Sequence, residues 1–343
     1  MSNLTFLTQE QCFESEKLDI LQKRGTKAAI TDFSILLGGW VDINPDYLHI
    51  DGDYSLEGRT GYYWTKSDDG DNDARVVDDD GDRYYYNAAL RNGGARPALP
   101  FSSISSIPTN GVSGAPKRAR DGVLEVEYGY YPQKAVSRDM QERLERAFER
   151  RSLSRTGKKY TTDSKKYYEY DEVFSPKQHE EFQLEEKRYV RVEANSCFDG
   201  FEFKLSNGES YINGDPVWVE VAPVKWLVDE RAKMMLTDKL IFAGVQFKHT
   251  RDYYTKDFDR TDIKTFMDRY LSKELEQSRG TIELGEQSEE IPEAQPRKSR
   301  LQKLNPDKTK QASRVRMTDT EIIQNWIEAG ESVLLRGPSG IGK

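Results

Sequence analysis

Short runs of alternating apolar and polar residues constrain the fold of this chain more than any other feature. In the clearest run, Leu124, Val126, Tyr128 and Tyr130 alternate with glutamate and glycine, which is the period of a half-buried strand. Pro223 predicts a break or an edge in a later run. Further strands are predicted at 189–192, 217–221 and 224–228. Because these strands do not alternate regularly with helices, the sequence predicts an α+β fold.

Capping residues and apolar stripes predict a few helices among these strands. The first is expected over about 8–23, within an N-terminal segment 1–26. Thr8 and Gln11 have the spacing of a capping box, and Gly25 stands beyond the end as a stop. Two later helices are expected to begin at Ser137 and near Thr261, each followed by apolar residues on one helical face.

Three segments lack such patterns. The stretch 102–120 is rich in Ser, Pro and Gly and is predicted to be an inserted loop, while 157–183 is polar without a clear period. From 276 to 315 apolar residues are sparse, and acidic residues give way to basic ones. Such a segment cannot bury enough surface to offset the cost of ordering, so we interpret 276–315 as a flexible linker.

Charge and composition bear on the class of protein. The net charge of -8 argues against a general affinity for nucleic acid. No apolar run is long enough to span a bilayer, and the first residues lack a signal-peptide pattern. We therefore expect a cytoplasmic protein that binds neither nucleic acid nor membrane. Cys12 and Cys197 are too few for a disulfide framework, and His49, His179 and His249 are expected at the surface because they stand in polar settings.

The last residues form a phosphate-binding motif. A helix capped by Thr318 and Glu321 is predicted to end at Gly330, and the apolar strand 332–335 follows. That strand leads into the pattern G-x-x-x-x-G-K, whose glycines let backbone amides approach phosphate oxygens. The predicted nucleotide-binding residues are Gly337, Pro338, Ser339, Gly340, Ile341, Gly342 and Lys343.

Helix, strand and loop together resemble the start of an AAA+ ATPase module, covering about 316–343. The resemblance implies ATP and Mg²⁺ as cofactors and self-association through AAA+ contacts, all in a longer protein. The hydroxyl that would hold Mg²⁺ and the later acidic residues are not present in these 343 residues. We therefore expect this chain to be unable to hydrolyse ATP by itself.

The most unusual stretch is 61–101, which has eight aspartates between Asp68 and Asp82 followed by three consecutive tyrosines. Crowded like charges oppose compact folding unless they face water or a cation, so these aspartates are expected at the surface. Asp69, Asp71 and Asp73 begin like a calcium loop, but Ala74 stands where glycine is needed. A solvated loop without metal is the preferred interpretation.

The two ends of this stretch, 61–67 and 94–99, resemble those of a C-type lectin-like domain related to the formylglycine-generating enzymes. The arrangement is similar to the variable proteins diversified by bacterial and phage retroelements, in which adenines of asparagine codons are mutated. Trp64, Arg96, Pro97 and Leu99 would then belong to the fixed scaffold, with a variable segment at 67–99. The resemblance implies a ligand-binding surface made of Asp78, Asp80, Asp82, Tyr84, Tyr85, Tyr86, Asn87, Ala88, Ala89, Arg91 and Asn92.

Three later stretches, 126–133, 223–228 and 261–267, resemble segments found early in such domains. Here they follow the variable-looking segment, which leaves open a rearranged single domain or two related lobes over 27–275. We expect a receptor that binds a ligand, by preference a protein, and that is coupled to the AAA+ module. A calcium-dependent sugar lectin, an oxidase of the formylglycine-generating type and a tyrosine-rich hairpin without a ligand are the alternatives.

Overall fold

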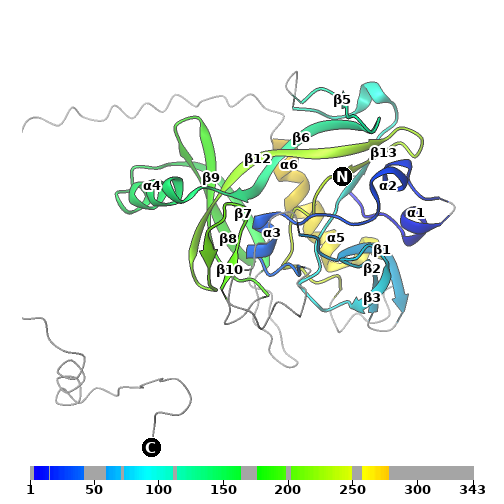
Figure 1. The fold of residues 1–343 in the computed structure, drawn as a ribbon, viewed down its shortest axis with the longest axis horizontal. Helices are drawn as coiled ribbons and strands as arrows, with labels where there is room; N and C mark the ends of the chain where they lie inside the picture. The colour runs from blue at the N-terminus through cyan, green and yellow to red at the C-terminus, as the bar shows by residue number, and fades with distance from the viewer. Residues whose placement is uncertain are drawn as a thin grey trace, which may run out of the picture. The chain divides into compact units, whose positions relative to one another are not determined.

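The computed structural model describes residues 4–14, 16–41, 59–70, 73–110, 114–163, 176–197, 202–248 and 257–277 (Figure 1). All of them belong to the first of two units into which the chain divides, Met1–Glu283 and Leu284–Lys343. The expected linker beyond 277 and the expected ATPase segment 316–343, with Gly337, Pro338, Ser339, Gly340, Ile341, Gly342 and Lys343, lie outside the described residues. Among the described helices, none is long and apolar enough to cross a membrane.

The described part is a mixed α+β structure built mostly from antiparallel sheet, as the sequence predicted. Its largest sheet has eight strands in the order β4-β13-β12-β9-β8-β7, with β6 paired to both β12 and β5. The strands are β4 (Ala98–Pro100), β5 (Lys117–Arg118), β6 (Leu124–Ala135), β7 (Ser154–Asp163), β8 (Pro176–Leu184), β9 (Lys187–Glu193), β12 (Pro216–Asp229) and β13 (Met234–Thr237). The expected loop 102–120 therefore contains a short strand, and the polar stretch 157–183 contains most of β7 and β8.

The two longest strands, β6 and β12, run side by side through the middle of this sheet (Figure 1). Of the break or edge predicted at Pro223, the structure shows the edge: β12 continues through Pro223 with a register shift between Pro223 and Lys225, and one side of the strand is without a described partner there. On its other edge β12 pairs with β9 over 216–220 and with β13 over 226–229. Pro223 thus lies where the neighbour on that edge changes, so its missing N–H interrupts no described pairing there.

Two smaller sheets contain the other described strands. One has the order β1-β2-β3, all antiparallel, and the other pairs β10 (Phe203–Lys204) with β11 (Ser210–Tyr211). The members of the first are β1 (Tyr63–Gly70), β2 (Asp73–Val77) and β3 (Arg83–Asn87). Isolated bridges continue from this sheet: Tyr63 of β1 pairs with Gly94 in the segment before β4, and Ala95 of that segment pairs with Phe242 in the segment after β13.

The expected N-terminal helix is divided into α1 (Gln9–Phe13) and α2 (Asp19–Arg24). Its predicted capping box is present at Thr8, and Gly25 ends α2 with φ 78°. The break lets Leu18 enter the core and lets the Ile20 amide donate to Asp229 Oδ2 on β12. Tertiary contacts therefore override the helical spacing in this segment.

The remaining helices include three that contact β6 or β12 of the large sheet. The remaining described helices are α3 (Asp32–Leu36), α4 (Arg138–Glu149), α5 (Asp262–Phe266), a π-helical turn (Met267–Leu271), and α6 (Ser272–Gln277); a short 3-10 turn at Ile104–Ser106 lies in the inserted loop, and another at Phe258–Arg260 precedes α5. The helices expected to begin at Ser137 and near Thr261 both have these residues at the N-cap. The Thr261 side chain accepts from the Lys264 amide, whereas the expected cap at Ser137 makes no side-chain hydrogen bond. The apolar face of α4 contributes Leu144 to a cluster with Phe182, Tyr189 and Trp218.

Candidate ligand-binding surface

Hydrogen bonds hold the backbone of the aspartate-rich turn between β2 and β3, some within the turn and some from residues outside it. The Asp78 amide donates to the Asp82 carbonyl, and the Gly81 amide donates to the Asp78 carbonyl, both at 2.9 Å. Gly81 has φ 94°, a conformation that favours glycine. From the rest of the molecule, Thr26 Oγ1 donates to the Gly81 carbonyl at 2.5 Å and Thr60 Oγ1 donates to the Asp79 carbonyl at 2.8 Å. The backbone of the turn is therefore anchored.

The aspartate side chains of this turn lie at or near the surface, as predicted. Asp80 and Asp82 are exposed, while Asp78 is half-buried. Asp80 Oδ1 accepts a hydrogen bond from the Asp82 amide at 3.0 Å, which holds its carboxylate over the turn. An anchored backbone with exposed carboxylates is suited to present negative charge in one place.

The three tyrosines form the strand β3, which stands at the end of its sheet. Tyr84 is 49% exposed and Tyr85 is 52% exposed. Their rings are nearly parallel, at 7°, with centroids 5.3 Å apart. Two large aromatic side chains thus stand half in water beside the aspartate turn, as the prediction required.

Tyr86 differs from its two neighbours because it is half-buried. Its ring centroid lies 4.5 Å from that of the buried Tyr62, and its hydroxyl donates to Asp78 Oδ1 at 3.3 Å. Burial, with the nearby Asp78 carboxylate, raises the pKa of Tyr86 to about 12. Tyr86 therefore links the surface to the scaffold.

The residues at and just after the end of β3 also differ in their exposure to solvent. Ala88 is only 2% exposed, so the expectation that it lies on the binding surface does not fit its burial. Its carbonyl accepts from the Lys248 amide, which holds this point of the chain against the scaffold. Asn87 is exposed, and its Oδ1 accepts from the half-buried Ala89 at 2.9 Å.

Arg91 and Asn92 are half-buried. Arg91 Nη2 donates to Gln246 Oε1 at 3.4 Å. Asn92 Oδ1 accepts from the Tyr62 hydroxyl at 2.5 Å, and its carbonyl accepts from the Trp40 amide at 2.7 Å. Both residues consequently join the segment after β3 to the scaffold.

The four expected scaffold residues lie inside the molecule or at its edge. Trp64 and Pro97 are buried and Leu99 is half-buried. Arg96 is 3% exposed, and its guanidinium donates to the carbonyls of Thr237 and Thr26 at 3.0 and 3.2 Å. It also lies over the Tyr63 ring at 5.4 Å. This arginine joins β1, β13 and the N-terminal segment.

The alternative functions depend on metal ligands, histidines or reactive cysteines. Within the described ranges, no group of three or more His, Cys, Asp or Glu could hold a metal ion; Asp71 of the calcium-like spacing, His49 and His249 fall outside those ranges. His179 is 7% exposed and packs edge-on against Phe33, so its expected surface position is wrong. Burial raises the pKa of the Cys12 thiol to about 12 and that of Cys197 to about 11, which keeps both protonated at neutral pH.

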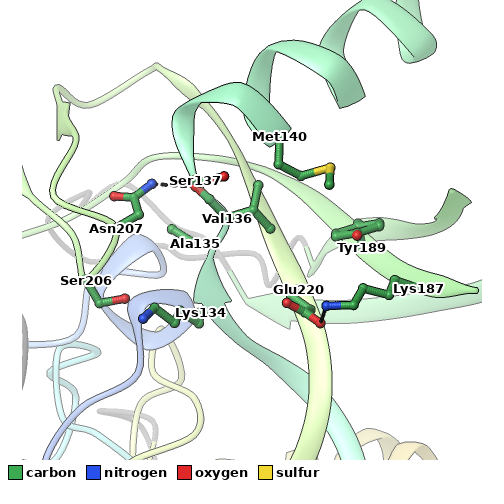
Figure 2. A pocket seen from close by; sticks show the side chains of 10 residues that line it. All are labelled: Lys134, Ala135, Val136, Ser137, Met140, Lys187, Tyr189, Ser206, Asn207 and Glu220. Carbon is green, nitrogen blue, oxygen red and sulfur yellow. Dashed lines mark hydrogen bonds and ion pairs between the residues drawn. The ribbon is translucent and has the colours of Figure 1, made fainter.

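Sequence reasoning did not anticipate a pocket of about 460 Å³ between the start of α4, β9, β12 and the β10–β11 connection (Figure 2). Several of its polar groups already have partners in the protein: Lys187 pairs with Glu220 at 2.8 Å, and Asn207 Nδ2 donates to the Val136 carbonyl at 2.7 Å. Ser206 Oγ donates to the buried Asp32. The pocket is lined by Lys134, Ala135, Val136, Ser137, Met140, Lys187, Tyr189, Ser206, Asn207 and Glu220.

Comparisons of the chain with models of protein families, with curated proteins and with solved structures found no match to any of them. The candidate site is consequently defined by its own geometry. We call the exposed side chains of Asp80, Asp82, Tyr84, Tyr85 and Asn87 the β3 surface.

Proposed function

We propose that this chain is a receptor module that recognises a ligand, by preference a protein, through the β3 surface. The observation that carries the proposal is the contrast between Tyr84 and Tyr85, which stand about half in water, and Tyr86, which is held by Tyr62. Tyrosine offers a large, rigid contact area and a hydroxyl at low entropic cost. Exposed rings on an anchored strand are therefore suited to binding a partner without rearrangement of the core.

We further propose that the domain is a C-type lectin-like module of the retroelement-diversified kind. The burial of Trp64, Arg96 and Pro97 beside exposed Tyr84 and Tyr85 supports this, because a variable surface requires a scaffold that does not depend on it. The antiparallel, mixed α+β architecture is compatible with such a domain. The unusual order of the motif-like segments keeps the choice between one rearranged domain and two lobes within the proposal.

The resemblance at 316–343 extends the proposal to the longer protein. There, a cytoplasmic AAA+ module would bind ATP and Mg²⁺, associate with its copies, and change its ATPase rate when the β3 surface is occupied. The proposed coupling of ligand binding to ATPase activity is based on the presence of the β3 surface and of segment 316–343 in one chain.

The ligand can be identified by crosslinking from the surface itself. A photoreactive phenylalanine analogue is introduced at Tyr85 and, as a control, at Ile212, which is similarly exposed at 53%. A crosslinked protein obtained from position 85 and absent from position 212 is expected. Identical products from both positions would remove the basis for a binding surface at β3.

Coupling and diversification need separate tests. Replacement of Tyr84 and Tyr85 by alanine in the longer protein is expected to abolish the ATPase response to the crosslinked ligand while leaving the basal rate intact. An unchanged response would refute coupling through this surface. In the neighbouring DNA, diversification requires a reverse transcriptase and a near-copy of the codons for 67–99 with adenines at the variable positions.

A further inference from the structure

Of the four aspartates in the turn between β2 and β3, the two that belong to the β3 surface are exposed to solvent. Asp78, Asp79, Asp80 and Asp82 fall within five residues, and Asp80 and Asp82 are exposed. Because the backbone of the turn is anchored by Thr26 and Thr60, the carboxylates cannot separate by local unfolding without loss of those hydrogen bonds. Like charges held together in this way raise the local attraction for a cation.

Two cationic residues lie close to the turn. Lys27 is exposed, and its Cγ would lie 2.9 Å from a Cβ at Gly81. Arg83, which follows Asp82 directly, is engaged elsewhere. Arg83 Nη1 lies 2.8 Å from Glu14 Oε1, and the Arg83 guanidinium lies over the Phe13 ring at 5.1 Å from its centroid. Its charge is therefore directed toward the end of α1 and shared with a carboxylate there. Within the described residues, the ion pair of Arg83 is with Glu14 and not with a carboxylate of the turn.

The aromatic part of the surface suits the same kind of partner. Tyr84 and Tyr85 present two nearly parallel rings immediately after the aspartates. Aromatic faces attract cations, and a planar guanidinium can both stack on a ring and donate two parallel hydrogen bonds to a carboxylate. Lysine can satisfy the charge but lacks the planar group.

Resting on the proposed function, we propose that the partner of the β3 surface is a protein segment that presents arginine side chains. One guanidinium stacks on Tyr84 or Tyr85, and a second pairs with the carboxylates of Asp80 and Asp82. An acidic or neutral partner would leave those carboxylates without a counter-charge and would lose the electrostatic attraction that steers association.

The test uses the 343-residue chain and a labelled hexapeptide, acetyl-Gly-Arg-Arg-Gly-Arg-Gly-amide, with binding measured by fluorescence anisotropy at low and high salt. Lysine and glutamine versions of the peptide report the preference for guanidinium and for charge. The double variants are Asp80→Asn with Asp82→Asn, and Tyr84→Leu with Tyr85→Leu. The control, Glu186→Gln with Glu193→Gln, removes the same charge from exposed residues at β9.

We expect the aspartate variant to weaken binding of the arginine peptide about tenfold, corresponding to about 1.4 kcal/mol, and the tyrosine variant several-fold. The control variant should bind like the parent chain, the lysine peptide should bind more weakly, and the glutamine peptide should not bind. Equal losses in the aspartate and control variants would mean only a general attraction to an acidic protein and would overturn the proposal.

The two proposals fail differently. If a protein crosslinks specifically from position 85 but binds the aspartate variant as tightly as the parent chain, at all salt concentrations, the receptor function stands and the basic partner is wrong. If no protein crosslinks specifically from position 85, the receptor function fails, and any binding of the arginine peptide is then adventitious.

Discussion

Tyr62 contacts two residues of the expected binding segment at once. Its ring centroid lies 4.5 Å from that of Tyr86, and its hydroxyl donates to Asn92 Oδ1 at 2.5 Å. Tyr62 itself is 2% exposed. This buried tyrosine therefore marks the inner boundary of the β3 surface, and the side chains that it contacts are expected to contribute to stability.

This boundary predicts different costs for neighbouring tyrosines. Tyr86→Ala should lower the free energy of unfolding by about 2 kcal/mol, because it removes a half-buried ring that packs on another aromatic residue. Tyr85→Ala should change it by less than about 0.5 kcal/mol, as is usual at exposed positions. Urea denaturation of the two variants makes the comparison, and equal losses would contradict the boundary.

Arg96 is predicted to be a structural residue. Arg96→Ala should cost about 3 kcal/mol or more, because the carbonyls of Thr26 and Thr237 lose a charged donor in a buried place. Arg118→Ala, at a side chain that is 55% exposed and pairs with Glu230, should cost less than about 1 kcal/mol. The midpoint of chemical denaturation measures both, and near-equal midpoints would count against this role.

The local patterns that sequence reasoning read correctly are those that need only neighbouring residues. The period over 124–130, the capping box at Thr8, the helix starts at Ser137 and near Thr261, and the exposed aspartates at 80 and 82 all follow from spacing or charge. Each depends on contacts that the chain makes with itself over a few residues, so the sequence alone carries the information.

The errors arose where distant partners decide. The polar residues of β7 and β8 form strands because their neighbours in the sheet complete the hydrogen bonding, although no apolar period marks them. Ala88 and His179 are buried by contacts with Lys248 and Phe33, which lie far away in the chain.

A pH dependence is expected at the contact of α4 with the large sheet. Hydrogen bonds from Arg191, at 2.8 Å, and from Trp218 lower the pKa of Glu145 below its usual 4.5. A carboxyl group whose pKa falls on folding stabilises the protein above its unfolded pKa, and this contribution is lost as pH falls through the folded pKa. The stability difference between the parent chain and Glu145→Gln should therefore be constant near pH 7 and decrease below about pH 4.5.

Thermal unfolding of both proteins between pH 3 and 7 measures this difference. Glu142→Gln is the control, because Glu142 lies on the same helix in more exposed pairs with Arg138 and Arg146. A difference for Glu145→Gln that is independent of pH, or that matches the control, would show that the pair with Arg191 does not stabilise the fold.

The last described helix, α6, packs on β6, and substitutions at two glycines can test this contact. Gly129 and Gly157 have almost the same backbone conformation, with φ 74° and 72°. A Cβ at Gly129 would lie 2.5 Å from Leu275 Cδ2 and 3.1 Å from its Cα, whereas a Cβ at Gly157 would meet nothing within 4 Å.

Gly157→Ala therefore reports the backbone strain alone, about 1 kcal/mol, and Gly129→Ala adds displacement of α6. We expect Gly129→Ala to cost at least about 2 kcal/mol more and to speed amide hydrogen exchange in 272–277, with no such change in Gly157→Ala. Similar exchange in both variants would mean that α6 does not depend on its contact with Gly129.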